Sequence, residues 1–490
     1  MRRKGRSNIV FNDETRLFVQ DIYTPVCDKS FLYHSCIILQ DVSLSKSDTE
    51  RHYYPSPLKY DEFLILASSP GIPNPGTSGL ETNFTTDNST LSKYFKTKCS
   101  FDMQVHIGKC QTKPSDFAQF DKALIFKDVT VHSYSIRSVM TATQDNRNPV
   151  TESMDFTFEK MYEVTRPTLF LFESDVVGAG PILDSFTFCN DTRCDLCVGT
   201  IGKYFIQILE CGEECHTARV IYTLDNGISW RVKHLNVCAD IGCEQNVNNN
   251  LIQDIDGTMV YYVYLNTSLG RTISQIVDNS IEVFSSSIVY GTEILKGYSS
   301  YNTTFYLGTN GRLLISKDGN ITRLTNMNFD ISKDLLSISS LDGYNFVLGT
   351  ENGRIHVGNI DNEVDTMVIP NGGNIHTISM VSDCSFVAAT GLSGGVVVQN
   401  GVPTKIRGIR GTITNFAFFN EDIGYATSFS NNINYIWQTV DGGKNWQSLD
   451  ATLPSTYVIT TLTVCDNDHN VVTLAGRKMD TPVTIEDVLN

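Results

Sequence analysis

Hydrophobic and polar residues alternate along several short stretches in the first third of the chain. In residues 151–162, Met154, Phe156 and Phe158 fall on one face of an extended strand, because successive strand side chains point to opposite faces. Such patterns predict strands over 30–44, 60–67, 101–108, 122–137 and 151–165. The polar, Gly- and Pro-containing stretch 66–92 predicts a long loop insertion, and 114–122 fits a short helix.

A different pattern, a repeat, occupies the last two thirds of the chain. Seven threonines each follow a β-type run and precede a turn-like stretch: Thr223, Thr267, Thr309, Thr350, Thr390, Thr427 and Thr473. The spacing between them averages roughly 41 residues, and the copies at Thr309 and Thr350 share the sequence Leu-Gly-Thr followed by Asn-Gly-Arg. A period near 40 with strand-like units is typical of a β-propeller, in which four-stranded blades stack around an axis. Seven copies predict seven blades.

The domain boundaries follow from these two patterns. Residues 1–165 form a mainly β domain without the repeat, and residues 183–490 form the propeller. Between them, residues 166–182 are expected to be a linker, because Pro167 interrupts the preceding strand and Gly178-Ala-Gly-Pro181 favours irregular chain. Since a propeller avoids an open edge, residues near 470–485 are expected to pair with strands near 201–222.

Two repeats contain a fuller motif of the form Ser/Thr-x-Asp-x-Gly-x-Ser/Thr/Asn-Trp. Its positions are Thr223, Asp225, Gly227 and Trp230 in one copy, Thr439, Asp441, Gly443 and Trp446 in another, and Asp318 in a degraded third copy. An aspartate at such a spacing accepts backbone N–H groups across a turn, glycine takes a positive φ, and tryptophan packs between strands. We expect all of these residues to be structural, and no catalytic residue among them.

This motif resembles the Asp-box of sialidases, sortilin-type receptors and photosystem-assembly propellers. Those proteins share the hairpin without sharing a function. A sialidase also needs an arginine cluster, a tyrosine nucleophile and a glutamate partner, together with a Phe/Tyr-Arg-Ile-Pro start. The chain has no such start, and its propeller arginines are sparse, with Arg312 and Arg354 at equivalent turn positions. We therefore expect no enzymatic activity.

A cluster of cysteines is a second candidate site. Seven of the 13 cysteines lie between residues 189 and 243, and the densest group is Cys189, Cys194, Cys197, Cys211 and Cys215. Their spacing fits local disulfides, four zinc ligands or reduced thiols, and the sequence leaves these three interpretations open. Cys99 and Cys110 are a further candidate pair, whereas Cys384 and Cys465 are expected to be buried thiols. No metal or cofactor is assigned.

Charge and composition narrow the classes of function. The net charge of −16 disfavours nucleic-acid binding, because phosphates attract Lys and Arg. No apolar run is long enough to span a membrane, and the basic start Met1-Arg-Arg-Lys-Gly-Arg6 lacks the apolar stretch of a secretory signal. That basic stretch is interpreted either as a loose terminus or as an arm that docks on an acidic neighbouring subunit.

The first domain carries a resemblance in its last two strands. Residues 127–136 (Lys-Asp-Val-Thr-Val-His-Ser-Tyr-Ser-Ile) and 149–160 (Pro-Val-Thr-Glu-Ser-Met-Asp-Phe-Thr-Phe-Glu-Lys) resemble the closing strands of Hcp proteins of type VI secretion and of bacteriophage tail tube proteins. The resemblance covers about 40 residues. It implies a small tube-type β-barrel that assembles into hexameric rings, with rings stacked into a tube.

These observations lead to one main hypothesis and one alternative. The chain is expected to be a virion structural protein of a bacteriophage tail, made in the host cytoplasm, with a tube-forming domain and an outward-facing propeller. Its partners would be other copies of itself, other tail proteins and a host-surface glycan or protein, and DNA would only pass through an acidic lumen. The alternative is a propeller adaptor or receptor-binding protein that engages a protein or glycan partner.

Overall fold

The structure is a computed structural model in which the chain divides into two compact units. The N-terminal unit comprises Met1–Arg166 and the C-terminal unit Pro167–Asn490. The residues that the structure describes are 15–21, 31–34, 37–39, 53–55, 63–65, 76–83, 90–97, 99–108, 120–137, 151–174, 182–188, 203–211, 216–223, 231–237, 249–253, 259–267, 270–277, 280–283, 294–300, 303–308, 310–317, 325–329, 333–369, 372–391, 394–453, 456–464 and 468–478.

The N-terminal unit is built on one eight-stranded sheet, in which β10 pairs with β8 beside the order β2-β1-β7-β8-β9-β6-β3. Its strands are β1 (Thr15–Gln20), β2 (Phe31–His34), β3 (Ile37–Leu39), β6 (Gly76–Asn83), β7 (Phe101–Ile107), β8 (Lys122–Arg137), β9 (Thr151–Phe158) and β10 (Lys160–Val164). A separate hairpin consists of β4 (Tyr53–Pro55) and β5 (Phe63–Ile65). Among the described pairings, the end strands β2 and β3 do not pair with each other, and closure of this sheet into the expected tube-type barrel stays a prediction.

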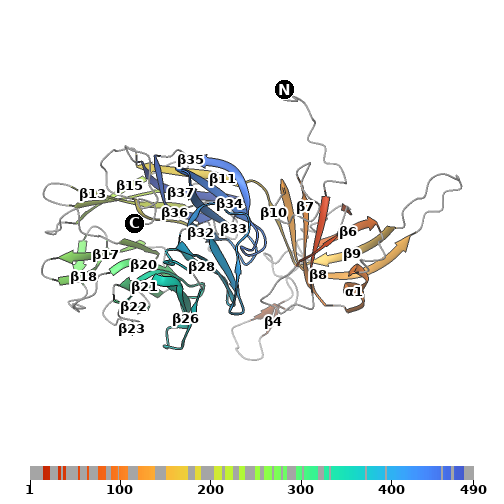
Figure 1. The fold of residues 1–490 in the computed structure, drawn as a ribbon, viewed down its shortest axis with the longest axis horizontal. Coiled ribbons are helices and arrows are strands. Elements are labelled where there is room, and N and C mark those ends of the chain that lie inside the picture. Colours follow the sequence, from red (N-terminus) through yellow and green to blue (C-terminus); the bar gives the residue numbers. More distant parts are fainter. Residues whose placement is uncertain are drawn as a thin grey trace, which may run out of the picture. The chain divides into compact units, whose positions relative to one another are not determined.

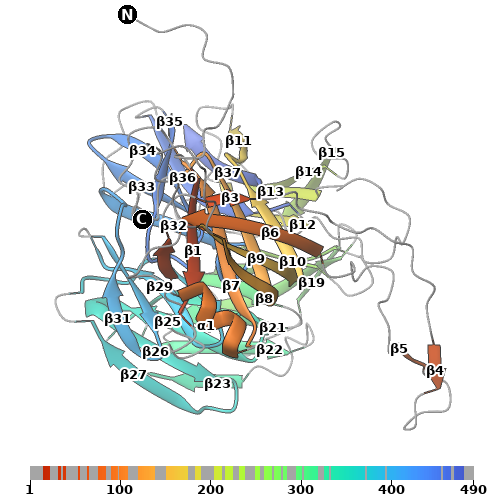
Figure 2. The same cartoon turned by 90° about the vertical axis from the view of Figure 1, so that its right-hand side faces the viewer.

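The long strand β8 joins two halves of this sheet. Its first half pairs with β7 and β10, and its second half pairs with β9 (Figure 2). The register shifts within β8 between Val131 and Ser133, where a bulge lets a strand bend. Both halves contribute side chains to one core, including Met103 from β7, Phe126 from β8 and Phe156 from β9. The alternation in residues 151–158 is confirmed, because Met154, Phe156 and Phe158 are buried as predicted.

The stretch 66–92, which the sequence predicts to be a loop, contains a strand and the start of a helix. β6 pairs with β9 on one side and with β3 on the other. The helix α1 (Thr90–Thr97) lies beside β8 and places the Tyr94 ring 4.2 Å from that of Phe101. β6 has only one large apolar residue, Leu80, so its strand conformation comes from its neighbours and not from local alternation.

Among the described residues, the C-terminal unit contains seven sheets (Figure 1). Six have four antiparallel strands, and their bounds are β12 (Ile182–Phe188), β13 (Lys203–Cys211), β14 (His216–Thr223), β15 (Arg231–Val237); β16 (Asn249–Gln253), β17 (Met259–Thr267), β18 (Gly270–Val277), β19 (Ser280–Val283); β20 (Ile294–Ser300), β21 (Thr303–Gly308), β22 (Arg312–Lys317), β23 (Thr325–Asn328); β24 (Leu335–Ser339), β25 (Asn345–Thr350), β26 (Arg354–Asn359), β27 (Val364–Val368); β28 (Ile378–Ser382), β29 (Ser385–Ala389), β30 (Gly395–Gln399), β31 (Val402–Lys405); and β32 (Thr412–Phe418), β33 (Gly424–Ser430), β34 (Ile433–Thr439), β35 (Gln447–Leu453). A short 3-10 helix, η2 (Glu351–Gly353), joins β25 to β26.

The seventh sheet closes the ring. It has the order β11-β37-β36, with β11 (Thr168–Ser174), β36 (Tyr457–Val464) and β37 (Val471–Lys478). The first strands of successive sheets contact one another in the cycle β12, β16, β20, β24, β28, β32 and β36, and β36 contacts β12 again. Seven sheets whose first strands form a closed cycle make the C-terminal unit a β-propeller.

Two expectations about this closure are corrected. Residues 168–174 are not linker but the strand β11, which pairs in parallel with β37. The last strand therefore pairs with β11 and β36 and not with strands near 201–222. The closing principle holds, since strands from both ends of the unit share one sheet. The short apolar run Leu169-Phe-Leu-Phe172 is the sequence feature that carries this strand.

The repeat anchors also differ from their predicted positions in three copies. Thr267 and Thr350 end the second strand of their sheets, but Thr223 ends the third strand of its sheet. Thr427 and Thr473 lie inside strands instead of ending them. The repeat therefore predicts the recurrence of the sheets, but its threonines do not occupy the same strand position in every blade.

Hydrophobic layers lie between adjacent blades. One layer includes Phe305 of β21 and Leu348 of β25, the next includes Val347 of β25 and Phe386 of β29, and a third includes Val387 of β29 and Trp437 of β34. Opposite faces of one strand thus pack against different neighbours, as the period of two along a strand requires. No helix among the described residues is long and apolar enough to cross a bilayer.

Candidate functional site

The turn between β34 and β35 is held by a compact set of hydrogen bonds. Thr439 Oγ1 donates to Asp441 Oδ1 at 2.8 Å and accepts the Gly443 N–H at 3.2 Å. Asp441 Oδ1 accepts the backbone N–H of Asn445 at 3.0 Å, and its Oδ2 accepts the Asn445 side-chain amide at 2.6 Å. Burial raises the pKa of Asp441, and the hydrogen bonds from Asn445 and Thr439 act in the opposite direction.

Backbone conformation and packing complete this turn. Gly442 and Gly443 have φ values of 67° and 91°, which residues with a Cβ rarely adopt. Trp446 is only 2% exposed, lies against Phe416 and Phe418 of β32, and donates its indole N–H to the Gly443 carbonyl at 2.7 Å. These contacts tie the third-to-fourth-strand connection to the first strand of the same sheet. The side chains of Thr439, Asp441 and Trp446 are thus buried and hydrogen-bonded within the turn.

The other residues of this motif fall mostly outside the described residues. Thr223 is the last residue of β14, while Asp225, Gly227, Trp230 and Asp318 lie outside the described part of the chain. The strand order nevertheless places all three motif copies equivalently. Each follows the third strand of a sheet, namely β14, β22 and β34.

The cysteine predictions have mixed outcomes. Cys189, Cys194, Cys197 and Cys215 lie outside the described residues, and Cys211 ends β13 opposite His216 of β14. Cys99 is an exposed free thiol and does not form the candidate pair with Cys110, which itself lies outside the described residues. Cys384 is disulfide-bonded, so the expectation of a buried free thiol is wrong there. It is half-buried, because it lies in the turn between β28 and β29 and not inside a strand, and Cys465 lies outside the described residues.

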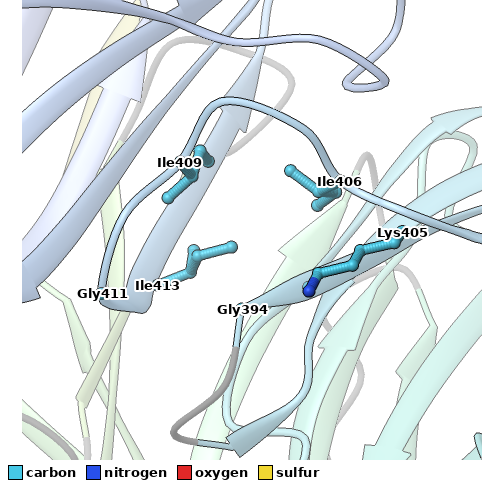
Figure 3. A pocket seen from close by; sticks show the side chains of 7 residues that line it. Gly394, Lys405, Ile406, Ile409, Gly411 and Ile413 are labelled. Atoms are coloured by element: carbon cyan, nitrogen blue, oxygen red, sulfur yellow. The ribbon is translucent and has the colours of Figure 1, made fainter.

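A small hollow lined by isoleucines, glycines and a lysine lies where the chain passes from β31 to β32. Figure 3 shows Ile406, Ile409 and Ile413 around it, with Lys405 beside it and Gly411 at its border. Its volume is about 220 Å³, below the range of about 300–1,000 Å³ that is typical of ligand pockets. Ile406 and Ile413 belong to the adjacent buried layer, so we interpret the hollow as a local packing gap.

A larger open cleft separates two neighbouring blades. This inter-blade cleft lies between the sheet β24–β27 and the sheet β28–β31 and has a volume of about 530 Å³. Val347, Val357 and Asp365 are opposite one another on β25, β26 and β27, so they share the sheet face that turns toward the next blade. Val347 is buried in the layer between the blades, but Val357 is 39% exposed. The face therefore continues beyond the part that the next blade covers.

The inter-blade cleft combines an apolar floor with an acidic rim. Buried Phe346, Met380 and Phe386 line it, as does half-buried Met367. Its exposed carboxylates are Glu363, Asp365 and Asp383. None of the described residues that line it is Lys, Arg or His. Such a surface attracts a partner that carries both positive charge and apolar side chains.

Sequence reasoning missed this cleft, and the repeat itself explains why. Ile315 and Val357 occupy the same repeat position, three residues after Arg312 and Arg354 respectively. Ile315 is fully buried, whereas Val357 is the exposed residue described above. Aliphatic residues at one repeat position thus differ in exposure because of how closely the next blade covers them. The only local signal is the acidic composition of the β26–β27 connection.

A ladder of polar side chains links β8 and β9 in the N-terminal unit. The cross-strand pairs, all within hydrogen-bond distance, are His132 with Thr157, Ser133 with Asp155, Tyr134 with Glu152 and Ser135 with Ser153. Burial raises the pKa of Glu152, while the hydrogen bond from the Tyr134 hydroxyl acts to lower it. Burial also raises the pKa of Tyr134, so this hydroxyl stays a donor.

Comparison with known proteins yields structural likenesses only. No family model matches the chain, and no curated protein matches it. A structure of YCF48 bound to D1 peptide has 9% identity and a TM-score of 0.43, covering 64% of this chain and 96% of that one. The crystal structure of the mitotic checkpoint complex also has 9% identity and a TM-score of 0.43, covering 62% and 93%. The RRP9 WD40 repeats have 14% identity and a TM-score of 0.37, covering 53% and 81%.

Proposed function

We propose that the C-terminal unit is a protein-binding propeller that takes a polypeptide segment of its partner in the inter-blade cleft. The observation that carries this proposal is the cleft itself, an opening of about 530 Å³ with an apolar floor and an acidic rim. Its volume lies within the range that is typical of binding pockets. Burial of the exposed Val357 side chain by a partner would contribute favourable free energy, since apolar area leaves water.

The edge of the cleft favours a polypeptide over a glycan as the ligand. β27 is the last strand of its sheet and, among the described strands, pairs only with β26. Thr366 and Asp365 of β27 are exposed and line the cleft. An edge strand offers backbone N–H and C=O groups to an extended peptide, which would add a strand while its side chains enter the cleft.

Selection from a displayed library of random peptides tests this proposal on the full-length chain. We expect enriched peptides that combine basic and apolar residues. Val357→Arg should weaken their binding at least tenfold, because it places a positive charge and a longer side chain in the cleft. Val402→Arg is the control, since Val402 is also an exposed valine, at 61% against 39% for Val357, and is not among the residues that line the cleft. Equal loss of binding in both variants, or enrichment of no peptide, would refute the proposal.

We propose as a second candidate the assembly role of a virion structural protein, a bacteriophage tail tube subunit with the propeller as a decoration. Two features support it. The segments that resemble tube proteins are the partner strands β8 and β9, paired from Thr130 with Thr157 to Arg137 with Thr151. The described sheet also has end strands, β2 and β3, which could extend into the sheet of a neighbouring copy.

Negative-stain imaging of the full-length chain separates the two candidates. A tube subunit would form hexameric rings or stacked tubes, with the N-terminal unit making the contacts between copies. A free adaptor would give single particles or small assemblies without a ring. Rings that persist in the Val357→Arg variant would show that assembly and binding at the cleft are independent properties.

A further inference from the structure

We propose that the inter-blade cleft receives the basic segment, residues 1–12, from a second copy of this chain. The inference rests on the proposed function, because it names the partner of that same cleft. Positive charge is concentrated at one place in an otherwise acidic sequence. The chain has a net charge of −16, yet Arg2, Arg3, Lys4 and Arg6 fall within five residues. No other window of five residues in the sequence carries four positive charges.

The order of residues in the basic segment matches the two parts of the cleft. Its positive side chains are followed by Ile9-Val10-Phe11, and the first acidic residue is Asp13. The cleft presents the carboxylates of Glu363, Asp365 and Asp383 at its rim and apolar side chains at its floor. A segment that places its arginines at the rim can therefore place its apolar residues over Val357 and Met367, with β27 as the edge on which it extends.

The short tether between the basic segment and β1 sets a condition on docking within one chain that docking between copies does not have. Phe11 is four residues before Thr15, the first residue of β1. Four residues of extended chain reach about 14 Å at most. Docking within one chain would require β1 to lie within that reach of the cleft, whereas docking between copies sets no such condition. Each copy would offer one segment and one cleft, which supports dimers or longer chains of copies.

Binding of a labelled peptide of residues 1–12, followed by fluorescence anisotropy, tests the charge match. The receptor is the full-length chain with Arg2, Arg3, Lys4 and Arg6 changed to Gln, so that its own segment does not compete. We expect binding at moderate ionic strength that weakens as salt is added. Adding Glu363→Gln, Asp365→Asn and Asp383→Asn to the receptor should reduce the affinity at least tenfold.

A charge-matched control separates this site from general attraction to an acidic protein. The control receptor instead carries Asp121→Asn, Glu159→Gln and Asp450→Asn, which remove the same charge from exposed positions elsewhere. It should bind the peptide like the unmodified receptor. A peptide with Ile9, Val10 and Phe11 changed to Ser should bind the receptor at least tenfold more weakly at unchanged charge. Equal affinity for the cleft and control receptors, or no binding, would overturn the inference.

Sedimentation of mixed variants tests the second-copy assignment. The wild-type chain should self-associate with rising concentration, and the segment variant and the cleft variant should each remain monomeric. A mixture of these two variants should form a one-to-one complex, because one supplies the intact cleft and the other the intact segment. Peptide binding together with a monomeric wild-type chain would place the segment in its own cleft and overturn this assignment. If library peptides bind the cleft but residues 1–12 do not, the inference fails while the proposed function stands.

Discussion

At the scale of single residues, the Trp446 side chain joins a turn to the blade that carries it. Its ring is buried against Phe416 and Phe418, and its indole N–H is satisfied within the turn. Trp446→Ala would leave a large cavity, so we expect a loss of about 3–5 kcal/mol in the free energy of unfolding. Urea denaturation measures it. Val402→Ala, at an exposed site, should change stability by less than about 0.5 kcal/mol, and similar values for both variants would contradict the packing described here.

The hydrogen-bonded pair of half-buried Tyr134 and buried Glu152 predicts a pH-dependent stability. Burial raises the Glu152 pKa above its ordinary value, so the native state binds this proton more tightly than the unfolded chain does. That contribution is present at pH values below the unfolded pKa and is lost as the pH rises through the native pKa. Tyr134→Phe removes the hydrogen bond that favours the charged carboxylate, so it should cost about 1.5–3 kcal/mol at pH 7 and less at pH 4.

Chemical denaturation of this variant at both pH values checks the sign of the effect. Glu152→Gln is the matched control, because it keeps the size of the side chain and removes its titration. In the Glu152→Gln background, the effect of Tyr134→Phe should no longer depend on pH. A Tyr134→Phe cost that is equal at pH 4 and pH 7 in the wild-type background would rule out this coupling.

At the scale of elements, the sequence predicts best those strands that alternate on their own. The expected strands 101–108 and 122–137 agree with β7 (Phe101–Ile107) and β8 (Lys122–Arg137). β6 was missed because its sequence, Gly-Thr-Ser-Gly-Leu-Glu-Thr-Asn, lacks alternation and its partners β9 and β3 lie far away in sequence. Strand formation there depends on cross-strand packing that a local pattern does not contain.

The closing strand β11 and the inter-blade cleft could not be predicted from the sequence, because both depend on segments that are separated along the chain. Its partner β37 lies about 300 residues later in the sequence, and the pairing is parallel. No turn links two such strands, so local rules for hairpins give no signal. The inter-blade cleft is likewise defined by how two blades meet, whereas the Thr439–Trp446 turn is local and its residues could be named from the motif alone.

The parallel pairing of β11 with β37 predicts that loss of one backbone hydrogen bond destabilises the closing sheet. The Thr168 N–H donates to the Asn470 carbonyl at 2.7 Å. Thr168→Pro removes this donor and should cost about 0.5–1.5 kcal/mol, with faster amide hydrogen exchange in β36 and β37. Thr168→Val keeps the N–H and should exchange like the wild-type chain. Unchanged exchange in the proline variant would mean that β11 does not hold the closing sheet.

At the scale of the whole molecule, the two units have different architectures and are expected to have different roles. The N-terminal unit supplies an eight-stranded sheet, and the C-terminal unit supplies a closed ring with the inter-blade cleft between two of its blades. A closed ring of blades leaves only short outer edges such as β27, so it serves as a rigid support on which a small binding surface stays in place. Function is therefore expected to depend on the cleft between two blades and not on the propeller fold as such.

Hydrogen exchange on the full-length chain, with and without a library-selected peptide, shows whether the inter-blade cleft is the protein-binding site. With peptide bound, we expect slower exchange in two stretches that border the inter-blade cleft, residues 345–367 and 380–401. Residues 424–446 of the neighbouring sheet, which do not line the cleft, should exchange at the same rate in both samples. Protection centred on any other blade, or on the N-terminal unit, would contradict the claim that this cleft is the protein-binding site.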